Sequence, residues 1–163
     1  MKKSDFPSWF GRKYPSLENL EDALEAHGCR ITRAEIGEDA LFVVGENGEP
    51  HVVILPFGAG PLRLAWLMAH ELGHLLQHSG YIGPWAHDRQ EHQAHRWAAL
   101  ALIPESAVQR YHNASLDAFV GALSKHYQDL PLRNCPEREL AGMIARMRLS
   151  LVEDRQDNNE EAV

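Results

Sequence analysis

His70, Glu71 and His74 form an H-E-x-x-H pattern whose residue types and spacing could bind a metal ion and use it. Residues four apart lie on one face of an α-helix, so His70 and His74 can present both imidazoles to one ion. Glu71 follows the first histidine and can act as general base on a water molecule at that ion. Two imidazoles and a carboxylate with one position left open are a typical catalytic zinc set, so we expect one Zn²⁺ per chain.

The helix that must carry this pattern is indicated by its flanking residues. Gly60-Pro61 can begin it, because proline in a first turn loses no hydrogen bond, and Gly80 can end it. Apolar residues occur nearly all the way round between them, which is typical of a helix buried in the middle of a domain. Its histidines need partners, and either a metal ion or hydrogen bonds to core neighbours could supply them. The apolar residues are Leu62, Leu64, Ala65, Trp66, Leu67, Met68, Ala69, Leu72, Leu75 and Leu76.

A third protein ligand must come from another element, and several downstream residues could provide it. Asp88 can cap a helix over 89–103. Glu91 lies on this helix seventeen residues after His74, which leaves room for the chain to turn back and pack antiparallel. Glu91 could instead be the capping partner of Asp88, because the two have capping-box spacing. The full set of candidates is His78, His87, Asp88, Glu91, His92 and His95.

Two segments in this order, His-Glu-Leu-Gly-His at 70–74 and the stretch from Glu91 to Pro104, resemble the ImmA/IrrE metallopeptidases. The family pattern is H-E-L-G-H followed by a helix of the form E-x-x-A-N-x-F-A-A-x-L-L-x-P, and the resemblance covers about 62–104. It implies a gluzincin-like fold, in which a short sheet lies beside the active-site helices. It also implies that the zinc ligands are His70, His74 and Glu91 and that Glu71 is the general base.

His95 stands where the family pattern has asparagine, one turn after Glu91. A polar residue at that spacing can orient a metal ligand through a hydrogen bond, and His95 could also replace Glu91 as third ligand. His78 lies one turn beyond His74, where a straight helix carries it away from the ion. We therefore expect it either to support a metal ligand through a hydrogen bond or to be a hydrogen-bonded interior histidine. Candidate donors to the oxyanion that forms during peptide hydrolysis are Tyr81, His87, His92 and His112.

The fold class expected is α+β, with a small antiparallel sheet of about three strands beside the H-E-x-x-H helix and a mainly helical C-terminal half. Ser16 can cap a helix that runs to about His27. Asn47-Gly48 predicts a hairpin, because both residues tolerate positive φ. Strands are indicated at 29–36, 41–44 and 51–55, and further helices at 104–113, 115–127 and 137–151.

Composition narrows the class of protein. The chain has 163 residues, enough for one core, and we expect a single zincin-like metallopeptidase domain over 1–152 with an acidic, disordered tail at 153–163. The net charge of −7 argues against nucleic-acid binding through the bulk surface. No apolar run is long enough to span a membrane or follows the first residues as a secretory signal. Cys29 and Cys135 are expected as free thiols in a reducing cytosol.

The expected function is that of a cytoplasmic, zinc-dependent and site-specific endopeptidase. The family resemblance implies a narrow protein substrate, such as a helix-turn-helix repressor. The alternative is a non-catalytic regulatory partner of another protein, in which zinc only stabilises the fold. That alternative needs a closed metal shell, for example one made by His70, His74, Glu91 and His95 together.

Overall fold

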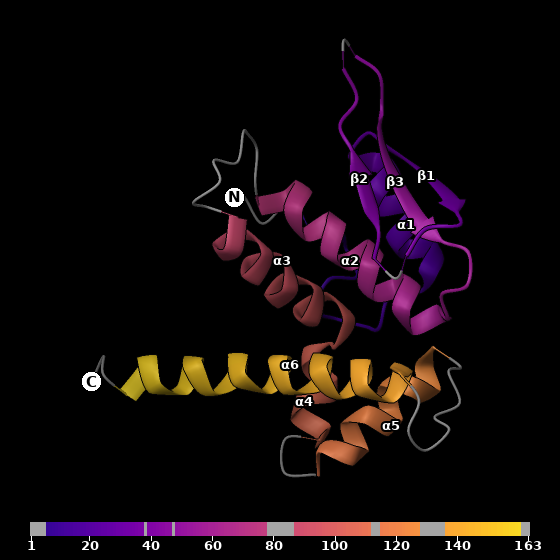
Figure 1. The fold of residues 1–163 in the computed structure, drawn as a ribbon. Coiled ribbons are helices and arrows are strands. Elements are labelled where there is room, and N and C mark those ends of the chain that lie inside the picture. Colours follow the sequence, from indigo (N-terminus) through magenta and orange to yellow (C-terminus); the bar gives the residue numbers. More distant parts are fainter. Residues whose placement is uncertain are drawn as a thin grey trace.

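The computed structural model describes residues 6–37, 39–46, 48–77, 87–111, 115–127 and 136–160. These residues form a three-stranded sheet and six helices (Figure 1), so the α+β class with a helical C-terminal half is confirmed. In chain order the elements are α1 (Leu17–Ala26), β1 (Cys29–Ala34), β2 (Leu41–Val43), β3 (His51–Pro56), α2 (Pro61–Gln77), α3 (His87–Leu102), α4 (Glu105–Tyr111), α5 (Leu116–His126) and α6 (Pro136–Glu160).

The sheet is mixed, which corrects the expectation of an antiparallel one. Its strand order is β1-β3-β2, and only β2 is antiparallel to β3, with Leu41 opposite Ile54. β1 runs parallel to β3, with Cys29 opposite His51. β3 is the most buried strand, and in the central position its backbone N–H and C=O groups find partners on both edges, as buried polar groups require. The predicted hairpin joins β2 and β3, and Gly48 in its turn has φ +87°.

The first helix forms where its capping residues predict it. The hydroxyl of Ser16 accepts from the backbone N–H of Asn19 at 3.1 Å, and the Asn19 side chain accepts from the Ser16 N–H at 3.2 Å. This reciprocal pair satisfies two backbone donors at the helix start. Leu20, Ala23 and Leu24 are buried along the inner face of α1, which packs against α2 and β1.

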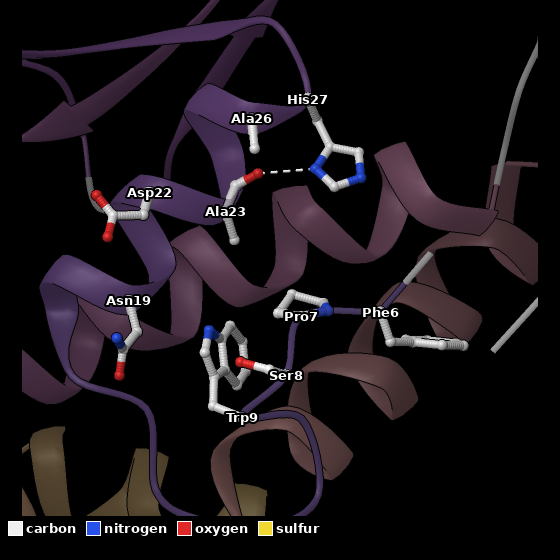
Figure 2. A pocket seen from close by; sticks show the side chains of 9 residues that line it. All are labelled: Phe6, Pro7, Ser8, Trp9, Asn19, Asp22, Ala23, Ala26 and His27. Carbon is white, nitrogen blue, oxygen red and sulfur yellow. Dashed lines mark hydrogen bonds between the residues drawn. The ribbon is translucent and has the colours of Figure 1, made fainter. Parts of the chain in front are cut away.

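The residues before α1 lie against it and extend to the helical half. Figure 2 shows Trp9 below Ala23, beside a surface hollow of about 410 Å³. His27 closes the other end of this hollow, and its Nδ1 donates to the Ala23 carbonyl at 2.7 Å. The Gly11 carbonyl accepts from the backbone N–H of Glu105 at 3.1 Å. The lead-in therefore connects α1 with the beginning of α4.

Helices α2 and α3 form the centre of the molecule, and α3 runs back alongside α2 (Figure 1). The apolar residues of α2 from Leu64 to Ala69 are all buried, which confirms a helix in the middle of the domain. Its expected end at Gly80 lies outside the described residues. α3 begins at His87, slightly before the Arg89 expected, and ends at Leu102 ahead of Pro104.

The C-terminal helices pack against the far end of α3. Arg148 of α6 is 2% exposed; its Nε donates to the Ile103 carbonyl at 3.1 Å and its guanidinium pairs with Glu105 at 2.7 Å. These contacts fix α6 to the junction between α3 and α4. α6 continues to Glu160, past the end expected near Leu151, so it includes much of the expected tail. No helix in the described ranges is long and apolar enough to cross a membrane.

Candidate metal centre

Three predicted ligands come together between α2 and α3. The Nε2 atoms of His70 and His74, one turn apart on α2, lie 3.1 Å from each other. Glu91 approaches from α3, with one carboxylate oxygen 3.2 Å from the His70 Nε2 and the other 3.2 Å from the His74 Nε2. Ligand atoms from all three residues lie within 4.8 Å of one another. His70, His74 and Glu91 are therefore close enough to bind one metal ion.

The spacing of these atoms fits a small divalent ion. Nitrogen and oxygen ligands lie about 2.0–2.1 Å from a tetrahedral zinc, which places neighbouring ligand atoms about 3.3 Å apart. The separations of 3.1 and 3.2 Å seen here are close to that value. Burial, followed by the neighbouring His74 and His95, lowers the pKa of His70 to about 4. Its imidazole is therefore neutral at pH 7, the form that binds metals.

Gly73 allows the two helices to approach closely enough for this geometry. A Cβ at this position would lie 3.1 Å from the Ala94 carbonyl oxygen and 3.2 Å from its Cα. Ala94, one turn from Glu91 on α3, is fully buried against this glycine. Sequence reasoning gave Gly73 no role. The available signal was a glycine inside a helix, where it costs about 1 kcal/mol relative to alanine and so calls for a packing reason.

Glu71 lies on the buried side of the same helix. Glu71 is only 8% exposed. Its burial and, to a smaller extent, the negative charge of Glu91 raise its pKa to about 7. Both causes disfavour the ionised carboxylate. A carboxyl group with a pKa near neutrality can both accept and return a proton at pH 7. This is the property expected of a general base that later acts as an acid.

His95 contacts the centre through its ring rather than as one of the three converging groups. Its ring centroid lies 4.7 Å from that of His70 and 5.4 Å from that of Trp66, on which it stacks. Trp66 also stacks on His70 at 6.4 Å. The rings of Trp66 and His95 thus hold the His70 imidazole in place by packing. Burial lowers the pKa of His95, so it too favours the neutral form.

The remaining sequence candidates are placed only in part. His78, Tyr81 and His112 lie outside the described residues. His87 is the first residue of α3, but its side chain is not among those described. His92 is exposed on α3. Cys29 is a buried free thiol as expected, and burial, followed by the charge of Glu71, raises its pKa. The predicted free thiol at Cys135 lies outside the described residues as well.

Comparison with protein families gives one match that covers the whole of this centre. Residues 24–127 match the peptidase family described as IrrE N-terminal-like domain. The matched segment runs from the end of α1 to the end of α5 and so includes the sheet, α2 and α3. Neither the comparison with curated proteins nor the comparison with solved structures gave a match.

Proposed function

Because the chain belongs to the peptidase family of the IrrE N-terminal-like domain, we propose that it is a zinc-dependent, site-specific endopeptidase of the cytoplasm. The observation that carries this proposal is the convergence of His70, His74 and Glu91 at tetrahedral spacing, with Glu71 buried beside them. The resemblance to ImmA/IrrE metallopeptidases supports a regulatory protein of the repressor type as substrate.

The donor set favours zinc over the harder divalent ions. Two imidazole nitrogens and one carboxylate suit zinc, whereas magnesium and calcium prefer oxygen ligands alone. His70 and His74 would supply the nitrogens, and Glu91 the oxygen. When bound, zinc polarises the scissile carbonyl and lowers the pKa of water at the site towards about 7.

Glu71 follows His70 in the chain, and its acidity suits the proton transfers of peptide hydrolysis. It neighbours His70 on α2, and its pKa of about 7 lets it be ionised before the reaction. The carboxylate would accept a proton from the attacking water and pass it to the leaving amine. General acid–base catalysis of this kind contributes about 10²–10⁴-fold to the rate.

The number of protein ligands distinguishes a catalytic zinc site from a purely structural one. A catalytic site has three protein ligands and keeps the fourth position for water or substrate. A closed shell would need His95 as a further ligand, and His95 lies instead with its ring against His70 and Trp66. It is not among the three groups whose ligand atoms converge in the described part of the chain. A catalytic site keeps one position free for water or substrate, and three protein ligands fit that requirement.

The test compares the zinc-loaded full chain with Glu71→Gln and with a matched exposed variant, Glu49→Gln, on regulators encoded beside this gene. We expect the wild type and Glu49→Gln to cut one regulator at one site. Glu71→Gln should keep one zinc per chain and cleave at least about 10²-fold more slowly. Unchanged cleavage by Glu71→Gln, with its metal content confirmed, would remove Glu71 from the mechanism. Cleavage that persists after the metal is removed would overturn the proposal.

A further inference from the structure

A second hollow, of about 460 Å³, lies between α4 and α5. These helices lie in the half of the molecule away from the sheet (Figure 1). The part of α3 that follows Glu91 is about 17 Å long at 1.5 Å per residue, and α4 begins only after it. The hollow is therefore separate from the metal centre. Its volume lies within the range of about 300–1,000 Å³ that small-molecule sites occupy.

The lining of this hollow consists of groups that attract or donate to anions. Arg110 and Lys125 bring two permanent positive charges, and none of the described residues that line the hollow is acidic. The hydroxyl groups can each donate a hydrogen bond to an oxyanion. The polar lining residues are Tyr14, Ser106, Arg110, Tyr111, Lys125 and His126. This composition is unexpected in a chain with 23 acidic and 16 basic residues.

Arg110 and Lys125 have no acidic partner among the described residues, unlike Arg138 and Arg148 of the same half. They are exposed, and no ion pair joins either of them to a described carboxylate. The paired cations of the same half are Arg138 with Asp117 at 2.8 Å and Arg148 with Glu105 at 2.7 Å. The two charges at the hollow are therefore available to a ligand.

The wall formed by Tyr14 and His126 is held firmly in place. The two rings stack at 4.8 Å, and the His126 Nε2 lies 3.4 Å from the Pro15 carbonyl, to which it can only donate. The hydroxyl of Tyr127 donates to the same carbonyl at 3.0 Å. Burial raises the pKa of Tyr14, so its hydroxyl keeps the proton that it can donate. Because this wall is already ordered, a ligand that binds against it loses less conformational entropy.

Helix ends explain part of this arrangement but not all of it. Arg110 lies in the last turn of α4, and Lys125 and His126 lie in the last turn of α5. Cations are favoured there by the negative end of the helix dipole, and an anion can bind beside such an end only where cations outweigh it. That preference acts on each helix separately. It does not account for two such ends facing one hollow together with the Tyr14 hydroxyl from a segment far away in the sequence.

We propose that this hollow binds the phosphate group of a small phosphorylated molecule, with Arg110 and Lys125 paired to the phosphate oxygens. An arginine fork and a lysine ammonium are the usual partners of phosphate, and a dianion can pair with both at once. The hollow is larger than a phosphate ion, and Ala107 and Ala122 give it apolar surface for the organic part of the ligand. The proposal is independent of the peptidase activity.

The test is an NMR titration of the full zinc-loaded chain at physiological salt, in which the backbone amide shifts are recorded. The three probes are inorganic phosphate, adenosine monophosphate and adenosine. We expect both phosphate-bearing probes to shift the amides around Arg110 and Lys125 at about millimolar concentration, and adenosine to leave them unchanged. Tighter binding of the nucleotide than of phosphate would show that the organic part contributes. Equal binding would show that the site recognises the phosphate alone.

Substitutions decide whether the hollow is responsible. Arg110→Gln and Lys125→Gln should each weaken phosphate binding at least about tenfold, the loss expected for one charge-assisted contact. The matched control is Arg146→Gln, an exposed arginine on α6 away from the lining, which should bind as the wild type does. No amide shift with inorganic phosphate would overturn the proposal. The same loss in the control as in Arg110→Gln would also overturn it, because binding would then depend only on net charge.

Discussion

The metal centre and the hollow between α4 and α5 show how two regions of one chain acquire opposite preferences. In the metal centre a carboxylate, Glu91, lies between two imidazoles, an arrangement suited to a cation. In the hollow two cations, Arg110 and Lys125, lie among hydroxyl groups, no described lining residue carries a carboxylate, and the proposed ligand is an anion. The net charge of −7 favours neither arrangement by itself. The groups within a few ångströms decide the ligand, because charges further away are screened.

The two regions also differ in how their groups are gathered. His70 and His74 are brought together by the pitch of one helix, and Glu91 by the next helix in the chain. Tyr14 and His126 reach the hollow from parts of the sequence that lie far apart. The first arrangement depends on local spacing and one antiparallel helix pair. The second depends on the way in which the whole chain packs.

The largest effect expected is the loss of metal on His74→Ala. One of three ligands disappears, and by the usual energies of zinc binding the affinity should fall on the order of 10²–10³-fold. The matched control is His92→Ala, because His92 is an exposed histidine on α3 next to Glu91 in the chain. Metal content measured after dialysis should fall in the first variant and remain at one per chain in the second. Equal metal content in both would mean that the converging groups are not the metal site.

The metal ligands are brought together by local spacing and the residues of the hollow by long-range packing. This difference explains what could be predicted from the sequence. The pattern at 70–74 and its distance from Glu91 predicted the ligand-bearing helices, and Asn47-Gly48 predicted the β2–β3 hairpin, because each signal is local. The parallel pairing of β1 with β3 was not predicted, since it joins strands that are not neighbours in sequence. The same holds for the hollow, whose lining comes from three separate segments.

Within the metal centre itself, the packing of rings and helices was the part that sequence could not supply. His95 was expected to donate to a ligand or to bind the metal; the structure adds that its ring packs on His70 and Trp66. The spacing of His95 on α3 fixes the side of the helix on which it lies but not the orientation of its ring. Gly73 likewise acquires its role only through Ala94 on the facing helix.

Glu71 should make the stability of the metal-free protein depend on pH. Its pKa is raised from 4.5 to about 7 in the folded chain, so the folded state binds more protons than the unfolded state between these values. The stability contributed by the protonated carboxyl is therefore fully present below about pH 4.5 and is lost as the pH rises through 7. A shift of this size corresponds to about 3 kcal/mol.

Urea unfolding in the presence of a chelator, for the wild type and Glu71→Gln at pH 5 and pH 8, measures this effect. Glutamine cannot ionise. The free energy of unfolding of the variant, relative to that of the wild type, should therefore rise by up to about 3 kcal/mol as the pH is raised. The lowered pKa of His70 acts in the opposite direction, since its cost appears as the pH falls from 6.5 towards 4, but it is the same in both proteins. A difference that does not change with pH would mean that the Glu71 carboxyl is not buried in the folded state.

The smallest effect comes from two glycines, one on a helix of the metal centre and one on a helix beside the hollow. Gly73 of α2 faces the backbone of Ala94, whereas nothing lies within 4 Å of a Cβ built on Gly121 of α5. Gly121→Ala should therefore stabilise the protein by about 0.5–1 kcal/mol through helix propensity. Gly73→Ala gains the same propensity but forces α3 away from α2, and we expect a net loss of about 1 kcal/mol.

The two variants also separate packing from metal binding, which thermal unfolding and zinc titration measure together. Because Ala94 and Glu91 lie on the same helix, moving α3 would carry the Glu91 carboxylate away from His70 and His74. Gly73→Ala should accordingly weaken zinc binding, and Gly121→Ala should leave it unchanged. If Gly73→Ala bound zinc as tightly as the wild type, the close contact between the helices would be a feature of packing alone. The position of Glu91 would then be set by the rest of α3.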